Sequence, residues 1–206
     1  MASHSALRRR EPVQQRSKRR VERILAAALQ LLESEGVEAV TTRAIAQRAE
    51  VPVATVYQFF PNRDAILQEI VLDHLDRRDA DGAAALAAMS PDSLADVAHA
   101  IFEFHYAHLR THPHLVRLHY SSVARGLLSD PRLRRAQFAD ALHAALVDWR
   151  LLDPDTDPMV TTVAVEMGDR ILELAHYAGP SKDRAVLAEG ERALIAYLQT
   201  YAEPNH

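Results

Sequence analysis

Apolar residues recur with a helical period along almost the whole of this 206-residue chain. From Lys18 onward they fall three and four positions apart on one face, and the run that they form ends at Gly36: Val21, Ile24, Leu25, Ala28, Leu31 and Leu32. A second run keeps the same period toward the alanine-rich residues 83–88: Ile66, Leu67, Ile70, Val71 and Leu75. Alternating strand patterns flanked by turn signals occur nowhere in the sequence. The pattern therefore predicts an all-α fold.

Capping and breaking residues divide this pattern into about nine predicted helices. Thr41 and Thr42 each offer a hydroxyl that can cap a helix beginning there. Pro52 suits the first turn of the next helix, Pro61 ends it and keeps the residue before it out of helical dihedrals, and Asn62 can cap its successor. Further helices are expected at about 91–111, 113–125, 130–152, 158–178 and 182–202.

Charge is distributed unevenly along the chain. Residues 1–63 hold 11 Lys and Arg against 6 Asp and Glu, whereas residues 64–206 hold 13 against 22. Residues 1–17 form a basic arm without an apolar period, which we expect to be flexible. A basic N-terminal third on an acidic body indicates that a polyanion, either nucleic acid or an anionic membrane, docks at that end. The alternative is a solvated charge run on a flexible tail.

Composition narrows the class of protein. The chain has no cysteine, which excludes a disulfide framework, a thiolate zinc site and a cysteine nucleophile. No apolar run reaches the ~18 residues needed to span a bilayer. We therefore expect a soluble cytoplasmic protein.

Residues 41–60 have the pattern of a helix-turn-helix. Small residues stand where two short helices would touch, and two valines would fill the space between them: Ala46, Ala49, Ala54, Val51 and Val56. The second helix would present hydroxyl, amide and apolar groups on its other faces, which suit phosphate oxygens, base edges and thymine methyl groups: Val53, Thr55, Tyr57 and Gln58. Periodicity alone leaves an ordinary antiparallel helix pair as the alternative.

The run AEVPVATVYQFFPNRDAIL, Ala49–Leu67, resembles the signature of the TetR family of transcriptional regulators. The upstream run ILAAALQLLESEGVEAVTTRAIA is similar to the family's first helix and the start of its second. The resemblance covers about residues 18–67 and departs from the family at two places. Glu50 replaces a usual turn glycine, where a positive φ would cost roughly 1 kcal/mol. Val53 and Ala54 stand where the family often has lysine or glycine.

This resemblance implies a three-helix DNA-binding domain at residues 18–78 and an effector-binding and dimerisation domain, a helical bundle, at residues 79–206. It also implies phosphate contacts from Thr42, Tyr57 and Arg63, and a base-edge or phosphate contact from Arg43. The recognition helix would enter the major groove. The full set of predicted DNA-binding residues is Thr42, Arg43, Val53, Ala54, Thr55, Tyr57, Gln58 and Arg63.

The two C-terminal helices each carry a glycine in mid-helix, which is tolerable where another backbone approaches. Their apolar stripes predict a four-helix dimer interface, an arrangement that the resemblance also implies. The predicted interface residues are Met167, Gly168, Ile171, Gly190, Leu194, Tyr197, Leu198 and Tyr201. The alternative is that both stripes face the subunit's own core.

Aromatic and mixed positions on the body helices predict a site for a small, largely apolar effector. The candidate ligand-binding residues are Phe102, Tyr106, Tyr120, Phe138, Leu142, Trp149, Asp169, Leu172 and His176. Each aromatic could instead be plain core. His105, His108 and His112 share one helical face at a possible metal spacing, but no carboxylate spacing accompanies them, so we expect solvated histidines, no metal and no cofactor.

No nucleotide-binding or hydrolase motif is present, so we expect no catalytic residues and no enzyme. The expected function is that of a homodimeric repressor that binds a palindromic double-stranded operator and is released by a small molecule. One alternative is a small-molecule-sequestering protein with a vestigial helix-turn-helix. Others are a transcriptional activator of the same family and an enzyme with a histidine-based metal site.

Overall fold

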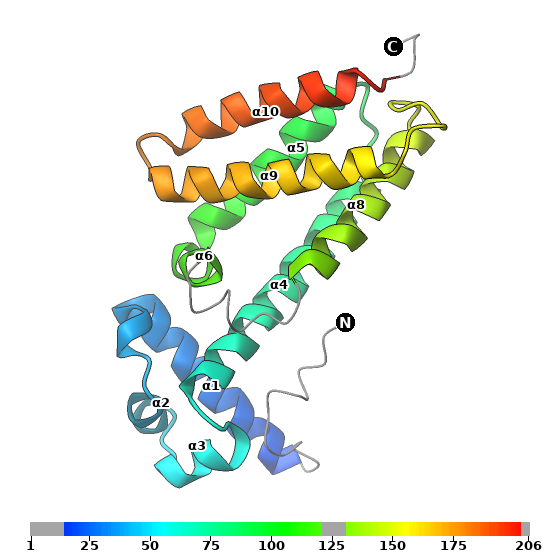
Figure 1. The fold of residues 1–206 in the computed structure, drawn as a ribbon. Helices are drawn as coiled ribbons and strands as arrows, with labels where there is room; N and C mark the ends of the chain where they lie inside the picture. Colours follow the sequence, from blue (N-terminus) through cyan, green and yellow to red (C-terminus); the bar gives the residue numbers. More distant parts are fainter. Residues whose placement is uncertain (1–14, 121–130, 203–206) are drawn as a thin grey trace. The chain divides into compact units, whose positions relative to one another are not determined.

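The computed structural model describes residues 15–120 and 131–202, and these residues form helices without any strand (Figure 1). The predicted all-α fold is confirmed. The described residues divide into two compact units, one of residues 15–80 and 112–120 and the other of residues 81–111 and 131–202. None of the described helices has the length and apolar character needed to cross a membrane.

The first unit contains the elements that the sequence places around the helix-turn-helix. They are α1 (Gln15–Glu35), the 3-10 turn η2 (Val37–Ala39), α2 (Thr42–Arg48), α3 (Val53–Phe59), the first part of α4 (Arg63–Ala87) and α6 (Pro113–Tyr120). α1 ends at Glu35 and is followed by Gly36, whose φ of 84° is readily adopted by glycine. α4 begins where predicted, because the Asn62 Oδ1 accepts a hydrogen bond from the N–H of Ala65 at 2.9 Å.

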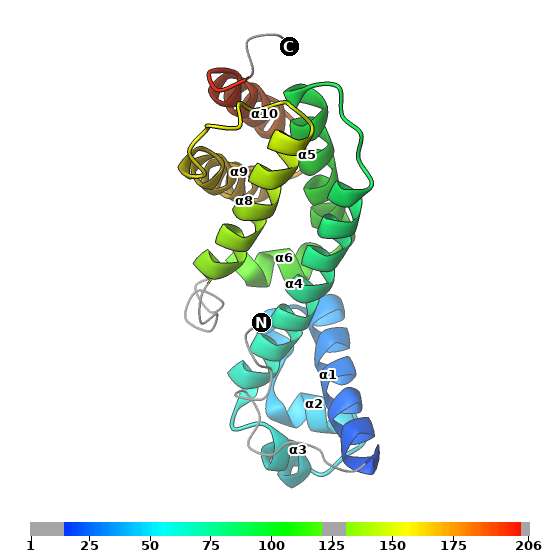
Figure 2. The same ribbon diagram turned by 90° about the vertical axis from the view of Figure 1, so that its right-hand side faces the viewer.

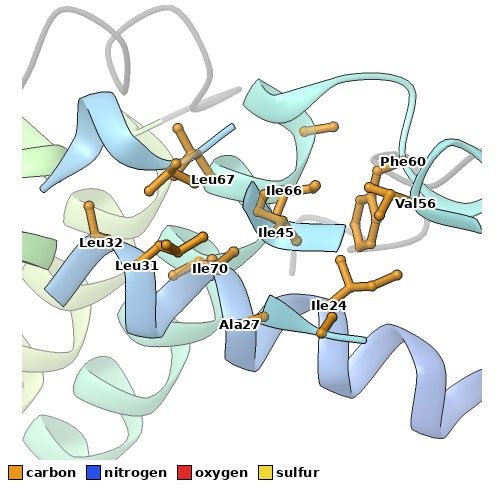
Figure 3. Close-up of a cluster of buried hydrophobic side chains, with 14 of the residues drawn as sticks. Ile24, Ala27, Leu31, Leu32, Ile45, Val56, Phe60, Ile66, Leu67 and Ile70 are labelled. Atoms are coloured by element: carbon orange, nitrogen blue, oxygen red, sulfur yellow. The ribbon is translucent and has the colours of Figure 1, made fainter. Parts of the chain in front are cut away.

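The core of the first unit joins α1, α2, α3 and α4 through apolar side chains that are closed to solvent (Figure 3). Ile24, Ile45, Val56, Phe60 and Ile66 are fully buried there. Burying each such side chain contributes roughly 1.5–3 kcal/mol. The two short helices α2 and α3 are therefore held by packing rather than by their own helical stability, which is marginal at seven residues each.

The second unit is a helical bundle of the end of α4 with α5 (Leu94–Thr111), α8 (Pro131–Asp148), α9 (Met159–Ala178) and α10 (Asp183–Gln199). α10 packs on both α9 and α5, and α8 packs on α9, as Figure 2 shows. The bundle has its own apolar core, in which Leu146 and Leu152 are fully buried.

Four helix boundaries differ from those predicted by three residues or more, and one of them is the end of α10, which lies at Gln199 rather than at about 202. α1 begins at Gln15, so Arg16 is helical rather than part of the loose arm. α5 begins at Leu94, because the Ser93 hydroxyl caps the N–H of Asp96 at 3.2 Å. α8 ends at Asp148, because Arg150 adopts a φ of 59° and the N–H of Leu151 turns back to the Leu146 carbonyl at 2.9 Å. The predicted arm up to residue 14 and the predicted helical residues 121–125 and 130 lie outside the described residues.

Candidate nucleic-acid interface

α2 and α3 form the predicted helix-turn-helix, and local residues define the ends of both helices. The Thr41 hydroxyl accepts a hydrogen bond from the N–H of Ala44 at 3.1 Å and so caps α2. Pro52 stands at the N-cap of α3, one residue before the expected first turn. Phe60 is extended, with φ −121° and ψ 132°, as expected for the residue before Pro61.

The turn between the two helices depends on a left-handed residue that is not glycine. Glu50 has a φ of 54°, and its N–H donates to the Gln47 carbonyl at 3.2 Å. The N–H of Val51 donates to the Ala46 carbonyl at 3.0 Å, which completes a Schellman motif at the end of α2. Glu50 therefore adopts the positive φ of the usual turn glycine, at a cost of roughly 1–2 kcal/mol for a residue with a Cβ.

The contact between the two helices uses most of the predicted small residues. Ala46, Ala49 and Val56 are buried, and Val51 packs against the same core. Ala54 is exposed, so its predicted place in the helix contact is wrong. It stands two positions before Val56, about 200° around the helix, and therefore shares the solvent-facing side of α3.

The exposed side of the helix-turn-helix brings together two hydroxyl groups predicted to bind phosphate. The Oγ1 of Thr42, at the start of α2, lies 3.2 Å from the Oη of Tyr57 on α3. Tyr57 is 43% exposed and Val53 is 38% exposed. One of these hydroxyls donates to the other, so an approaching phosphate oxygen can take the remaining proton, or a proton from each helix once the bond between the hydroxyls opens. The remaining predicted contacts are also accessible, with Arg43, Ala54 and Gln58 exposed and Thr55 half-buried.

Arg63 has a partner within the unit that the sequence did not indicate. Its Nη2 donates a hydrogen bond to the carbonyl of Val37 in η2, 26 positions earlier in the chain. Its Nε is buried and has no hydrogen-bond partner among the described residues. The side chain thus ties the start of α4 to the turn between α1 and α2, and the predicted phosphate contact stays a prediction beside this structural contact.

Replacing Arg63 by alanine is expected to lower the free energy of unfolding by about 1–3 kcal/mol, because it removes a hydrogen bond from a charged group and leaves the Val37 carbonyl without that donor. Urea denaturation of the purified protein measures the loss. Arg43→Ala is the matched control, since Arg43 is exposed and should change stability by less than about 0.5 kcal/mol. Equal stability of the two variants would show that the contact with Val37 stabilises nothing.

Most of the predicted ligand-binding residues lie in the core of the second unit. Phe102 and Leu142 are buried, and four others are partly buried against them: Tyr106, Phe138, Trp149 and Leu172. Tyr106 lies beneath the guanidinium of Arg184, whose carbon is 3.8 Å from the ring centroid. The hydrogen bond with Glu103 raises the pKa of that guanidinium. These six predicted ligand-binding residues therefore pack together in one core.

Three further ligand-site residues have other neighbours. Tyr120 belongs to the first unit, where its ring meets that of His119 edge-on at 4.8 Å. The Asp169 carboxylate accepts a hydrogen bond from Arg135 Nη1 at 3.3 Å, so this acid has a cationic partner on α8. The His176 ring lies edge-on to the ring of its neighbour Tyr177, with centroids 5.4 Å apart. These contacts were not visible from helical periodicity.

The three histidines at a possible metal spacing contact different groups. The Nδ1 of His105 lies 2.8 Å from the carbonyl of Ile101. The His108 ring stacks on Phe104, and the His112 ring meets His74 edge-on with centroids 4.9 Å apart. Within residues 15–120 and 131–202, no three His, Asp or Glu side chains are grouped so that they could hold a metal ion.

Much of the predicted dimer interface packs inside one subunit, and that part of the prediction is corrected. A Cβ placed on Gly190 would lie 2.3 Å from Ile171 Cγ2, so Gly190 is where α10 approaches α9. A Cβ on Gly168 would lie 3.7 Å from Leu194 Cδ1. Leu194 and Leu198 are buried in the same core, whereas Met167 and Tyr197 are partly buried and Tyr201 is exposed. The buried residues therefore face the core of their own subunit, which was the alternative to a dimer interface.

Comparison with known sequences identifies relatives of the helix-turn-helix segment and of a longer part of the chain. Residues 24–70 match the family described as bacterial regulatory proteins, tetR family. The HTH-type transcriptional repressor KstR of Rhodococcus jostii is 32% identical over 162 residues, which are 72% of this chain and 66% of that protein. KstR of Mycolicibacterium smegmatis is 33% identical over 135 residues, which are 65% of this chain and 57% of that protein. The chain thus spans somewhat less than two thirds of each of these relatives.

Solved structures match over nearly the whole chain. A TetR-family transcriptional regulator from Streptomyces coelicolor is 28% identical, with a TM-score of 0.64, over 89% of this chain and 98% of that one. A TetR-family transcriptional regulator from Pectobacterium atrosepticum is 15% identical, with a TM-score of 0.71, over 93% and 98% of the two chains. The second likeness shows a shared fold.

Proposed function

Because the chain belongs to the TetR family of bacterial regulatory proteins, we propose that it is a ligand-responsive repressor that binds a palindromic operator as a homodimer. The observation that carries the proposal is the pair of hydroxyls of Thr42 and Tyr57, 3.2 Å apart beside the exposed face of α3. Phosphate contacts of this kind fix the orientation of a protein on duplex DNA. Val53, Ala54 and Gln58 then face the base edges of the major groove.

The exposed chemistry of α3 suits a limited set of base contacts. Val53 and Ala54 offer only apolar surface, so discrimination there rests on contact with thymine methyl groups. Gln58 supplies an amide that can pair with adenine in the major groove. We therefore propose that A·T pairs occupy the positions that α3 reads.

A second copy of the chain is the proposed occupant of the exposed face of α9. Four large apolar side chains are exposed there at spacings that place them on one side of the helix: Met159, Val163, Leu174 and Tyr177. Beside them, α10 exposes small side chains that allow a neighbouring helix to come close: Ala185, Ala188, Ala193 and Ala196. Pairing α9 and α10 with their counterparts would bury this face in a four-helix interface.

The proposed effector is a small, largely apolar molecule that binds in the second unit near Phe102, Phe138 and Leu172. The aromatic and apolar character of this core supports the proposal. Effector binding would favour a conformation in which the two recognition helices no longer match successive major grooves, which lie about 34–36 Å apart. By linkage, operator DNA would weaken effector binding by the same factor.

Selection of bound duplexes from random DNA, followed by release of the selected duplex with a panel of metabolites, tests the function. A palindromic consensus and at least one releasing compound are expected. Equal binding of random and selected duplexes at moderate salt would overturn the proposal. In cells, deleting the gene should raise expression beside the selected site, whereas a fall in expression would identify an activator.

Tyr57→Phe is expected to weaken binding of all duplexes by about three- to tenfold without changing the preferred sequence, because one phosphate hydrogen bond is lost. Val53→Ala should instead alter which duplex is preferred. Repeating the selection with each variant measures both effects. A changed consensus for Tyr57→Phe would show that its hydroxyl reads a base.

A further inference from the structure

The first turns of α1 carry a face made of arginine. Four arginines recur at positions i, i+3, i+4 and i+7, and all are exposed: Arg16, Arg19, Arg20 and Arg23. This spacing places them on one side of the helix, along the edge of the stripe that Val21 and Ile24 bury in the core, with Arg20 one turn before Ile24. We call these four residues the arginine stripe.

The arginine stripe is not neutralised within the described part of the chain. None of its members forms an ion pair or hydrogen bond with another residue in 15–120 or 131–202, in contrast to Arg48, which is bound by Glu35 at 2.9 Å. Glu22, the one acid among residues 15–23, falls on the flank of the helix, one turn after Lys18. Four uncompensated guanidinium groups on one face form a surface for a polyanion, because each presents a planar fork of donors suited to phosphate.

The arginine stripe lies at the same end of the first unit as the recognition helix α3. In both views the N-terminal end of α1 lies at the same end of the unit as α3 (Figures 1 and 2). From Arg16 to Arg23 the helix rises about 10 Å, which is comparable with three nucleotide steps of ~3.4 Å measured along the axis of the duplex. The stripe can therefore follow a stretch of backbone beside the bases that α3 faces.

We propose that the arginine stripe is a second DNA-binding element, which holds phosphates flanking the groove that α3 enters. This inference rests on the proposed function, since it requires a duplex on the helix-turn-helix. The stripe precedes the residues that match the family, which begin at residue 24. Because it contacts phosphate alone, it adds affinity and salt dependence to every sequence equally.

The test compares two double variants that remove the same charge. R16Q/R23Q removes two members of the stripe, and K18Q/R110Q removes one cation from the flank of α1 and one exposed cation from α5. Glutamine is a good helix former, so α1 is retained, which circular dichroism checks. Binding of the selected duplex is measured by fluorescence anisotropy between about 0.05 and 0.4 M salt.

For R16Q/R23Q, the slope of log affinity against log salt should become less steep by about 1.8, with binding roughly 60-fold weaker at 0.1 M salt, while K18Q/R110Q keeps the wild-type slope. Identical slopes for R16Q/R23Q and wild type, with wild-type binding intact, would overturn this inference and leave the proposed function standing. Absence of specific binding by the wild type would overturn both. Binding to phosphatidylserine vesicles that depends on the stripe, with an unchanged DNA slope, would replace DNA by a membrane as the partner.

Discussion

Replacing Leu174 by aspartate is expected to make the protein monomeric at micromolar concentration and to weaken binding of a palindromic duplex about 100-fold or more. Leu174 is 44% exposed on α9, on the face that we propose a second copy covers. A carboxylate there would be buried without a partner, which costs several kcal/mol. Loss of the dimer then removes the gain in affinity that two linked half-sites provide. Analytical ultracentrifugation and mobility-shift titration measure the two effects.

Ala107→Asp is the control for this variant, because Ala107 is exposed on α5, away from the proposed dimer face. It adds the same charge to the same unit and should leave both the dimer and operator affinity unchanged. A Leu174→Asp protein that sediments as the wild-type dimer would exclude this face of α9 from the interface. A wild-type monomer at micromolar concentration would contradict the dimer itself.

Gly190→Ala is expected to lower the free energy of unfolding by about 1–3 kcal/mol, although alanine is the better helix former. The added Cβ would stand 2.3 Å from Ile171 Cγ2 and 2.9 Å from Ile171 Cδ1, so α9 and α10 must separate or Ile171 must leave its position. Since isoleucine in a helix strongly prefers one χ1 rotamer, rotation of the side chain gives little relief. Differential scanning calorimetry should record a fall in melting temperature of roughly 2–4 °C for each kcal/mol.

Two comparisons isolate the cause of this loss. Gly168→Ala places its Cβ at an ordinary 3.7 Å from Leu194 Cδ1, so better helix propensity should make it neutral or stabilising by up to ~1 kcal/mol. Combining Gly190→Ala with Ile171→Ala removes the atoms that collide, and the double variant should be more stable than the sum of the two single losses predicts. If Gly190→Ala were as stable as Gly168→Ala, the close approach of the two helices would be wrong.

The helix boundaries of the helix-turn-helix could be predicted from the sequence because their determinants are local. The caps at Thr41 and Asn62 and the break at Pro61 act within a few residues of their own positions, and each appears in the structure. The hydrogen-bond partner of Arg63 could not be predicted in this way. Its partner is the Val37 carbonyl, 26 positions away, and no periodic signal indicates which way a long, flexible side chain turns.

The apolar stripes of α9 and α10 show a second limit of prediction from helical periodicity. Helical periodicity identifies residues that share a face, such as Gly190 and Leu194, but it does not identify the helix that covers them. Two faces of α9 are apolar in this chain, one packed against α10 and one exposed at Val163 and Tyr177. Only the packing of the helices distinguishes these two apolar faces. Because the sequence does not show this packing, residues of the core were predicted to lie in the dimer interface.

The left-handed residues that end α2 and α8 have a consequence for engineering of the protein. Glu50 and Arg150 hold φ values of 54° and 59° at positions where glycine would avoid the steric cost of a Cβ. Natural proteins are kept only just above the stability that function requires, so such positions persist without being optimised. A more heat-resistant form of this protein is therefore within reach at two surface turns, with no change to either core. A substitution at Arg150 also leaves the turn that presents α3 unaltered.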